Sequence, residues 1–180
     1  MSKNSIIYDD LFRYCGKRSF PSLLRYVLFT PGFRYIYLFR KCKKKNFLFP
    51  LYRFLLLKCS HKYGIQIPYQ TEIGKGFRIV HFGMVVINPC TKIGSNFNIS
   101  NGCTIGNSGD KKNGVPIIGN YVSMQANSVI VGDVKIGNNV LIAPNTFVNF
   151  DVPDDSIVIG TKASIIHKNQ ASNKQFVYTV

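Results

Sequence analysis

Residues 118–148 read IGNYVSMQANSVIVGDVKIGNNVLIAPNTFV, and this stretch decides the fold. Every sixth residue in it is apolar: Ile118, Met124, Ile130, Ile136, Ile142 and Val148. The residue two places before each later member is small or β-branched: Val122, Ser128, Val134, Val140 and Thr146. An amphipathic helix repeats every ~3.6 residues and an alternating strand every ~2, so this period fits neither. It indicates a solenoid of short strands joined by tight turns.

The same period continues upstream in two further runs. These are Ile73, Ile79 and Val85, and then Ile87, Ile93, Ile99 and Ile105. The phase slips by two residues between Val85 and Ile87, and it breaks again between Ile105 and Ile118. The inward positions provide an adequate core, since each is worth ~1.5–3 kcal/mol when fully buried. A β-sandwich is the alternative, but its turn signals would come every ~8–12 residues.

Three segments carry a closer resemblance: 73–88 (IGKGFRIVHFGMVVIN), 92–107 (KIGSNFNISNGCTIGN) and 115–148. Over roughly residues 65–166 the chain resembles the hexapeptide-repeat acyltransferases, and among them the serine acetyltransferase branch. The resemblance implies an all-β left-handed parallel β-helix with an N-terminal α-helical region. That hand is an exception to the usual right-handed crossover.

The resemblance and the composition together predict the organisation of the chain. Residues 1–63 form a basic, aromatic helical region, and residues 64–166 form the β-helix acetyltransferase domain. A polar, Gly-rich loop at 107–116 interrupts the repeat, and such loops on rigid scaffolds often carry function. Residues 167–180 form a C-terminal tail.

The basic character belongs to the N-terminal third. Of the net charge of +15, residues 1–63 contribute +12, from 14 basic and 2 acidic residues. Leu and aromatic residues interleave with Lys and Arg there, which suits a helix lying on an anionic membrane surface. The alternative, equally open, is that these helices pack on the β-helix and solvate their basic face. No apolar run reaches the ~18–20 residues of a membrane span.

Several function classes are disfavoured by composition. Nucleic acid is not an expected partner, because the basic patch comes without a recognisable binding motif. Five cysteines without CxxC or His/Cys ligand spacing predict neither a disulfide framework nor a metal site. The first ten residues include Asp9 and Asp10 and lack the apolar core of a secretory signal. A reducing, cytoplasmic location is therefore expected, at the inner face of the cytoplasmic membrane if the helices bind it.

His81 is the candidate catalytic residue. It lies inside the repeat, close to the two-residue phase slip, where an ordinary turn role is the alternative. In the family that it resembles, the matching His is the general base. It removes the proton from an acceptor hydroxyl, which attacks the thioester of the cosubstrate acetyl-CoA without a covalent enzyme intermediate. An imidazole with a pKa near ~6.5 suits this step at neutral pH.

The resemblance also implies binding residues. The pantetheine arm of the coenzyme meets small-residue turns, which match Gly106, Ala126 and Ala143, although simple fit at a solenoid corner explains the two alanines as well. Lys162 would meet the nucleotide phosphates. Asn101, Lys111 and Lys112 are candidate acceptor-binding residues, with turn or solvent-exposed roles as the alternative. Because the coenzyme groove of the family lies between subunits, a homotrimer is implied.

Departures from the serine acetyltransferase pattern bear on the acceptor. Gln66 stands where that branch has the Asp that orients the His, Val80 replaces an acidic residue, and Gly114-Val115 replaces an Arg-His pair. A serine zwitterion needs charged partners, whereas a neutral sugar hydroxyl does not. The chain is therefore most similar to the polysaccharide O-acetyltransferases of capsule and exopolysaccharide synthesis, with a sugar or lipid-linked glycan as acceptor.

Three other functions remain as alternatives. They are serine O-acetylation, a γ-type carbonic anhydrase, and a non-catalytic β-helix scaffold. The carbonic anhydrases need three histidines on the repeat to bind zinc, and only His81 lies in the repeat proper.

Overall fold

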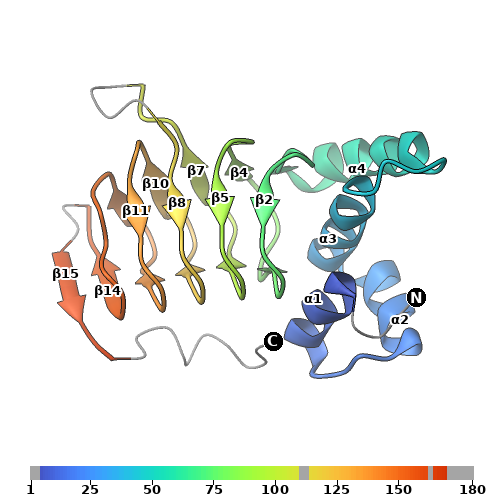
Figure 1. The fold of residues 1–180 in the computed structure, drawn as a ribbon, viewed down its shortest axis with the longest axis horizontal. Coiled ribbons are helices and arrows are strands. Elements are labelled where there is room, and N and C mark those ends of the chain that lie inside the picture. The colour runs from blue at the N-terminus through green and yellow to red at the C-terminus, as the bar shows by residue number, and fades with distance from the viewer. Residues whose placement is uncertain (1–4, 110–113, 162–163, 170–180) are drawn as a thin grey trace.

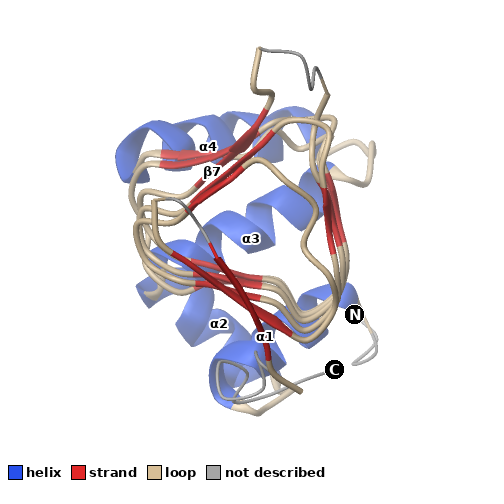
Figure 2. Ribbon diagram, turned by 90° about the vertical axis from the view of Figure 1, so that its left-hand side faces the viewer, coloured by secondary structure: helices blue, strands red, loops and turns tan. Residues whose placement is uncertain are grey.

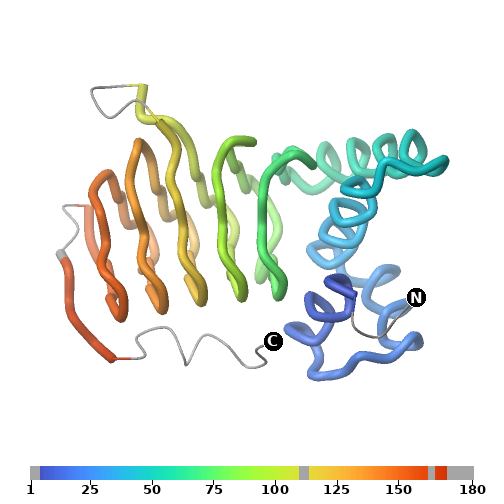
Figure 3. The backbone as a smooth tube through the Cα atoms, in the orientation of Figure 1, coloured from blue at the N-terminus to red at the C-terminus, as the bar shows by residue number. Residues whose placement is uncertain are grey.

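The computed structural model describes residues 5–109, 114–161 and 164–169. Four helices come first, and short strands follow in stacked coils that extend away from them (Figures 1 and 3). The helices are α1 (Ile6–Cys15), α2 (Phe20–Phe29), α3 (Pro31–Cys42) and α4 (Phe49–Tyr63). Within the described ranges, no helix combines the length and the apolar character that crossing a membrane requires.

Local signals in the sequence set the helix ends. Pro31, in the Thr30-Pro31-Gly32 break, is the first residue of α3, where its missing N–H costs nothing. Gly64 ends α4 in the left-handed conformation, φ 62°, which glycine adopts without a steric penalty. The sequence gives no firm indication of α1, because residues 1–20 are mixed in composition.

Successive strands join three sheets in turn, so the chain winds into a parallel β-helix. Figure 2, viewed along the coil, shows the three sheets as the sides of a triangle. The first sheet holds β1 (Ile65–Gln66), β4 (Val85–Ile87), β7 (Thr104–Gly106), β10 (Val129–Val131) and β13 (Phe147–Val148). The second holds β2 (Glu72–Ile73), β5 (Lys92–Ile93), β8 (Ile117–Ile118) and β11 (Lys135–Ile136). The third holds β3 (Arg78–Ile79), β6 (Asn98–Ile99), β9 (Ser123–Met124), β12 (Leu141–Ile142), β14 (Ser156–Ile159) and the antiparallel β15 (Ser164–His167).

The six-residue period is the spacing from one sheet to the next. Ile118 pairs with Ile136, so a regular coil takes 18 residues. Every periodic apolar residue from Ile73 to Val148 is buried, at 6% exposure or less. The small or β-branched residues two places earlier, such as Val122 and Ser128, are buried as well. The core is therefore a stack of inward side chains, as the sequence predicts.

Insertions into this repeat occur at two corners. Ile79 pairs with Ile99, a coil of 20 residues, and Ile93 pairs with Ile118, a coil of 25. The two extra residues of the first coil fall between β3 and β4, around His81. The seven of the second fall between β7 and β8, in the loop at 107–116, of which residues 110–113 lie outside the described residues.

The Ile-Gly pairs are required by the close stacking of the coils. A Cβ on Gly119 would lie 2.7 Å from the carbonyl oxygen of Gly137 in the next coil. Side chains then bridge the coils beside these glycines. The Asn120 Oδ1 accepts a hydrogen bond from the Ser95 N–H at 2.8 Å, and the Asn138 Oδ1 accepts one from the Asn120 N–H at 2.9 Å.

Helices α1 and α3 cover the open end of the first coil. A coil with no preceding neighbour leaves backbone N–H and C=O groups unpaired, and these need partners. The Tyr35 hydroxyl donates to the Ile67 oxygen at 2.8 Å and accepts from the Ile67 N–H at 3.1 Å. Tyr14 does the same for Ile79, at 2.8 and 3.0 Å. Burial raises the pKa of Tyr35 to about 12, so its hydroxyl keeps the proton that it donates.

A buried ion pair completes this cover. The Arg40 Nε donates to the Asp10 Oδ2 at 2.8 Å, and both residues are at most 5% exposed. The Arg40 guanidinium also donates to the Ile73 and Gly74 oxygens, each at 2.6 Å. The Asp10 Oδ1 accepts from the Phe77 N–H at 2.8 Å. The sequence left open whether the helices bind a membrane surface or pack on the β-helix. In the structure, α1 and α3 pack on the β-helix.

Replacing Asp10 by Ala should destabilise the protein by about 3–5 kcal/mol, because Arg40 would keep a buried charge without its partner. The matched control is Asp9→Ala, which removes the exposed ion pair to Arg18 at 2.9 Å and should cost less than ~1 kcal/mol. Urea unfolding of both variants measures the difference. Equal losses would contradict a special role for the buried pair.

Candidate active site

His81 lies on the corner where the chain passes from the third sheet to the first. The segment from Val80 to Met84 joins β3 to β4 and carries the two extra residues of this coil. The His81 side chain is exposed. Gly83 has φ 117° and Met84 has φ 50°, and Met84 is 77% exposed. The turn residues of the later coils at this corner, Asn127 and Asn145, have the same left-handed conformation, with φ 59° and 57°, so Met84 keeps the regular turn of the β-helix.

The same corner in later coils carries three of the predicted site residues. Strand register makes Asn101 the equivalent of His81 in the second coil and Ala126 the equivalent in the third. Ala143 follows on this corner in the fourth coil. Backbone bonds continue along it, from the Asn127 N–H to the Asn101 oxygen at 2.9 Å and from the Asn145 N–H to the Ala126 oxygen at 3.0 Å. We call this edge the His81 corner.

The remaining predicted site residues lie elsewhere. Gly106 ends β7, on the opposite edge of the first sheet, where the loop at 107–116 begins. Lys111, Lys112 and Lys162 lie outside the described residues. The His81 corner and the Gly106 edge are therefore separate corners of one chain.

No carboxylate of the described residues bonds to the His81 ring, and the side chains beside it are apolar. Val80, Phe82 and Met84 are 39%, 48% and 77% exposed. The Phe82 ring meets the Tyr63 ring edge-on, with the ring centroids 5.2 Å apart. Gln66, at the place of the family's Asp, is exposed in β1 and pairs with Val86 of β4. An open imidazole with these neighbours is able to accept a proton from an alcohol.

The apolar side chains around His81 are a feature that the sequence interpretation missed. The signal for them is the run HFGM at 81–84, in which Phe82 and Met84 flank a glycine. The two extra residues turn these side chains out of the core, so they do not follow the inward period. Among the described residues, no group of three His, Cys, Asp or Glu side chains is placed to hold a metal ion.

A parallel β-helix built from six-residue units, with an exposed histidine at one corner, is the architecture of hexapeptide-repeat proteins. The family model described as "Bacterial transferase hexapeptide (six repeats)" matches residues 116–149. The "Putative colanic acid biosynthesis acetyltransferase WcaB" of Escherichia coli (strain K12) is 37% identical over 118 residues, which are 66% of this chain and 71% of that protein. The chain belongs to the hexapeptide-repeat acetyltransferase family, and it is an acyltransferase.

Serine acetyltransferases are also similar to this chain. That of Helicobacter pylori (strain ATCC 700392 / 26695) is 36% identical over 108 residues, 59% of this chain and 63% of that protein. The structure of soybean serine acetyltransferase matches with a TM-score of 0.74 and 27% identity, covering 92% of this chain and 69% of that one. The structure of the Neisseria gonorrhoeae enzyme matches with a TM-score of 0.72 and 26% identity, covering 97% and 70%.

Gly102 at the His81 corner and Gly106 at the end of β7 should respond differently to substitution. Gly102→Ala places a side chain at φ 70°, where the new Cβ would collide with the Asn127 side chain, so we expect a loss of more than ~1 kcal/mol. Gly106→Ala meets nothing within 4 Å and should leave stability within ~0.5 kcal/mol of the parent. Thermal unfolding of both variants tests this, and a tolerated Gly102→Ala would contradict it.

Proposed function

We propose that this protein is an acetyl-CoA-dependent O-acetyltransferase that modifies a sugar hydroxyl in surface polysaccharide biosynthesis. The observation that carries the proposal is the exposed His81 imidazole, flanked by Val80, Phe82 and Met84 where a zwitterionic acceptor would need charged partners. The similarity to an acetyltransferase named for colanic acid biosynthesis supports a polysaccharide context.

In the proposed reaction, His81 is the general base and no covalent enzyme intermediate forms. The neutral imidazole accepts the proton of the acceptor hydroxyl as its oxygen attacks the carbonyl carbon of the acetyl thioester. The new C–O bond forms, the C–S bond breaks, and the proton passes from His81 to the departing thiolate. Acetylated acceptor and free coenzyme A leave, and His81 is neutral again.

We also propose that the protein is a homotrimer that binds coenzyme A between neighbouring subunits. A solved structure titled "Serine Acetyltransferase- Complex with CoA" shares the fold at 22% identity, with a TM-score of 0.71 over 89% of this chain. We assign the coenzyme to Gly106, Ala126, Ala143 and Lys162. Gly106 lies on a different corner from the two alanines, so a groove between neighbouring copies would bring the two sets together. The coil would be left-handed, as the relatives imply.

The acceptor side of the site is assigned to Asn101 and to Lys111 and Lys112 of the loop at 107–116. Asn101 is half-buried and stacks on the His81 turn in the next coil. Its carbonyl oxygen accepts the Asn127 N–H at 2.9 Å and its side-chain Oδ1 accepts the Ser100 hydroxyl at 3.2 Å, so its side-chain amide nitrogen is the group we assign to the acceptor. Serine O-acetylation is the second candidate function, favoured by the similar serine acetyltransferases.

We further propose that the chain works in the cytoplasm, at the inner face of the membrane. In this arrangement residues 1–63 form the helical region, residues 64–166 the transferase domain and residues 167–180 the tail.

His81→Ala should lower turnover by about 10²–10⁴-fold, because the general base is removed from an exposed position that the fold does not need. Release of free thiol from acetyl-CoA measures turnover, and circular dichroism checks the fold. His61→Ala, an exposed histidine of α4, is the matched control and should retain activity. Full activity of His81→Ala would overturn the assignment.

The acceptor class is tested by the same thiol-release measurement across a panel. Uncharged sugars, nucleotide sugars, lipid-linked glycans and serine are compared at equal concentration. We expect a sugar-bearing acceptor to give the highest kcat/KM and serine to give the lowest. A preference for serine would replace the proposal by its second candidate.

Gly106→Ala separates coenzyme contact from folding. Its Cβ has open space around it, so stability should not change, yet it would narrow the approach of the pantetheine arm. We expect KM for acetyl-CoA to rise several-fold with KM for the acceptor unchanged. An unchanged KM for acetyl-CoA would remove Gly106 from the proposed coenzyme site.

A further inference from the structure

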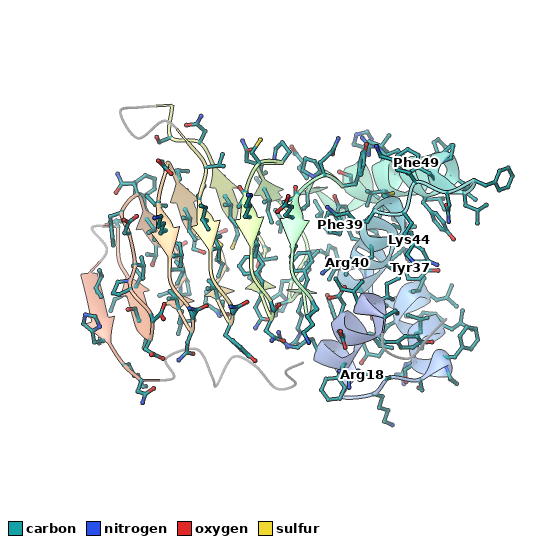
Figure 4. The ribbon with its side chains drawn as sticks, in the orientation of Figure 1. Arg18, Tyr37, Phe39, Arg40, Lys44 and Phe49 are labelled. Carbon is teal, nitrogen blue, oxygen red and sulfur yellow. The ribbon has the colours of Figure 1, made fainter. Side chains whose placement is uncertain are left out.

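Helices α2, α3 and α4 enclose a groove on the side of α3 that faces away from the strands. Its volume is about 350 Å³, within the ~300–1,000 Å³ of small-molecule sites. Its apolar wall includes Val27, Leu38 and Leu55. In Figure 4, Arg40 lies on the strand side of α3, and Tyr37, which also lines the groove, lies farther from the strands. The helices that cover the coil therefore carry a separate apolar site behind it.

Three cations line the same groove: Arg34, Lys58 and Lys62. The Arg34 Nε donates to the Val27 oxygen at 2.7 Å and its Nη1 to the Tyr63 hydroxyl at 3.0 Å, which fixes the guanidinium at the groove. The sequence contains no Asp or Glu from residue 11 to residue 71. Among the described residues, the ion pairs formed by the acids Asp9 and Asp10 go to other arginines. The groove therefore combines hydrocarbon walls with positive charge that no carboxylate neutralises.

The surface beside the groove is apolar and exposed. On α2, Phe20 is 67% exposed and Phe29 is 77% exposed, with Leu24 and Leu28 about half exposed between them. Exposed apolar side chains with interleaved cations suit contact with an anionic amphiphile.

The groove is connected to the His81 corner through two aromatic rings. Tyr63 lines the groove, and its ring meets the ring of Phe82, the residue after His81, at 5.2 Å between centroids. Gly64 follows directly, and a Cβ there would lie 3.0 Å from the Met84 nitrogen. The wall of the groove and the His81 corner are therefore in direct contact through these two rings.

We propose that the groove binds a phosphate-bearing lipid, with its hydrocarbon chain against Val27, Leu38 and Leu55 and its phosphate on Arg34, Lys58 and Lys62. The head group beyond the phosphate then lies toward His81, and the assignment of this lipid as the carrier of the acetyl acceptor rests on the proposed function. The proposal that the groove binds such a lipid is independent of the proposed function.

A second copy of the chain is a poorer occupant on electrostatic grounds. In a two-fold contact through this face, the cations of one copy would meet the same cations of the other. The stretch from residue 11 to residue 71 offers no acidic residue to neutralise them. Like charges across an interface oppose association, whereas a phosphate provides the missing counter-charge.

The test is calorimetric titration of the full chain with dodecyl phosphate below its micelle concentration. Dodecyl maltoside, which has the chain without the charge, and inorganic phosphate, which has the charge without the chain, are titrated in parallel. We expect saturable binding of dodecyl phosphate, with one molecule per chain, at least 10-fold tighter than either comparison compound. Lys58→Gln/Lys62→Gln should weaken it at least 10-fold, and Leu55→Asp should do the same through the apolar wall.

The matched control is Lys44→Gln/Lys45→Gln, which removes the same charge from exposed positions outside the groove and should leave binding unchanged. Equal weakening by this control, or binding of inorganic phosphate as tight as that of dodecyl phosphate, would overturn the proposal. So would self-association lost in Lys58→Gln/Lys62→Gln without any lipid binding. His81→Ala should bind dodecyl phosphate normally, so a failure of the proposed function and a failure of the groove are distinguishable.

Discussion

The structure depends on how the outer backbone groups of the first coil are paired. Every later coil bonds to its predecessor, but the first has none, and α1 and α3 bury its outer edge, so the helices must supply partners for its N–H and C=O groups. The hydroxyls of Tyr35 and Tyr14 each bond to both the N–H and the C=O of one residue, Ile67 and Ile79 respectively. The Asp10–Arg40 pair bonds to three further backbone groups of this coil. The helical region is thus part of the β-helix in an energetic sense, and it cannot be removed without exposing that edge.

Irregularity in the repeat is what creates the candidate site. Where the period is kept, the periodic apolar side chains point inward, and at the Ile-Gly turns the next coil leaves no room for a Cβ. Two additional residues before β4 release His81, Phe82 and Met84 from that pattern and expose them on a corner. The coils above hold the backbone of this corner in register, so the position from which the His81 side chain projects is set by the β-helix.

Sequence alone could predict the interior, because periodicity is a local property. The inward residues from Ile73 to Val148 and the αL end at Gly64 follow from spacing and residue type. Asp10 shows the limit: nothing in residues 1–20 indicates a partner thirty positions away, because the contact to Arg40 is made by tertiary packing. The sequence already places His81 close to the phase slip at Val85–Ile87, and the pairing of Ile79 with Ile99 confirms that this coil has two extra residues. Arg34 and Lys62 likewise meet at one groove only after three helices have packed.

The position of the covering helices in the chain has a consequence for biogenesis. Both α1 and α3 precede β1, so a growing polypeptide completes the surface that receives the first coil before that coil has been translated. Helices α1, α2 and α3 pack on one another through residues close in sequence, and each coil needs only its immediate predecessor as a template. The β-helix can therefore form coil by coil from the N-terminal side during translation, because each new strand pairs with one that has already been made.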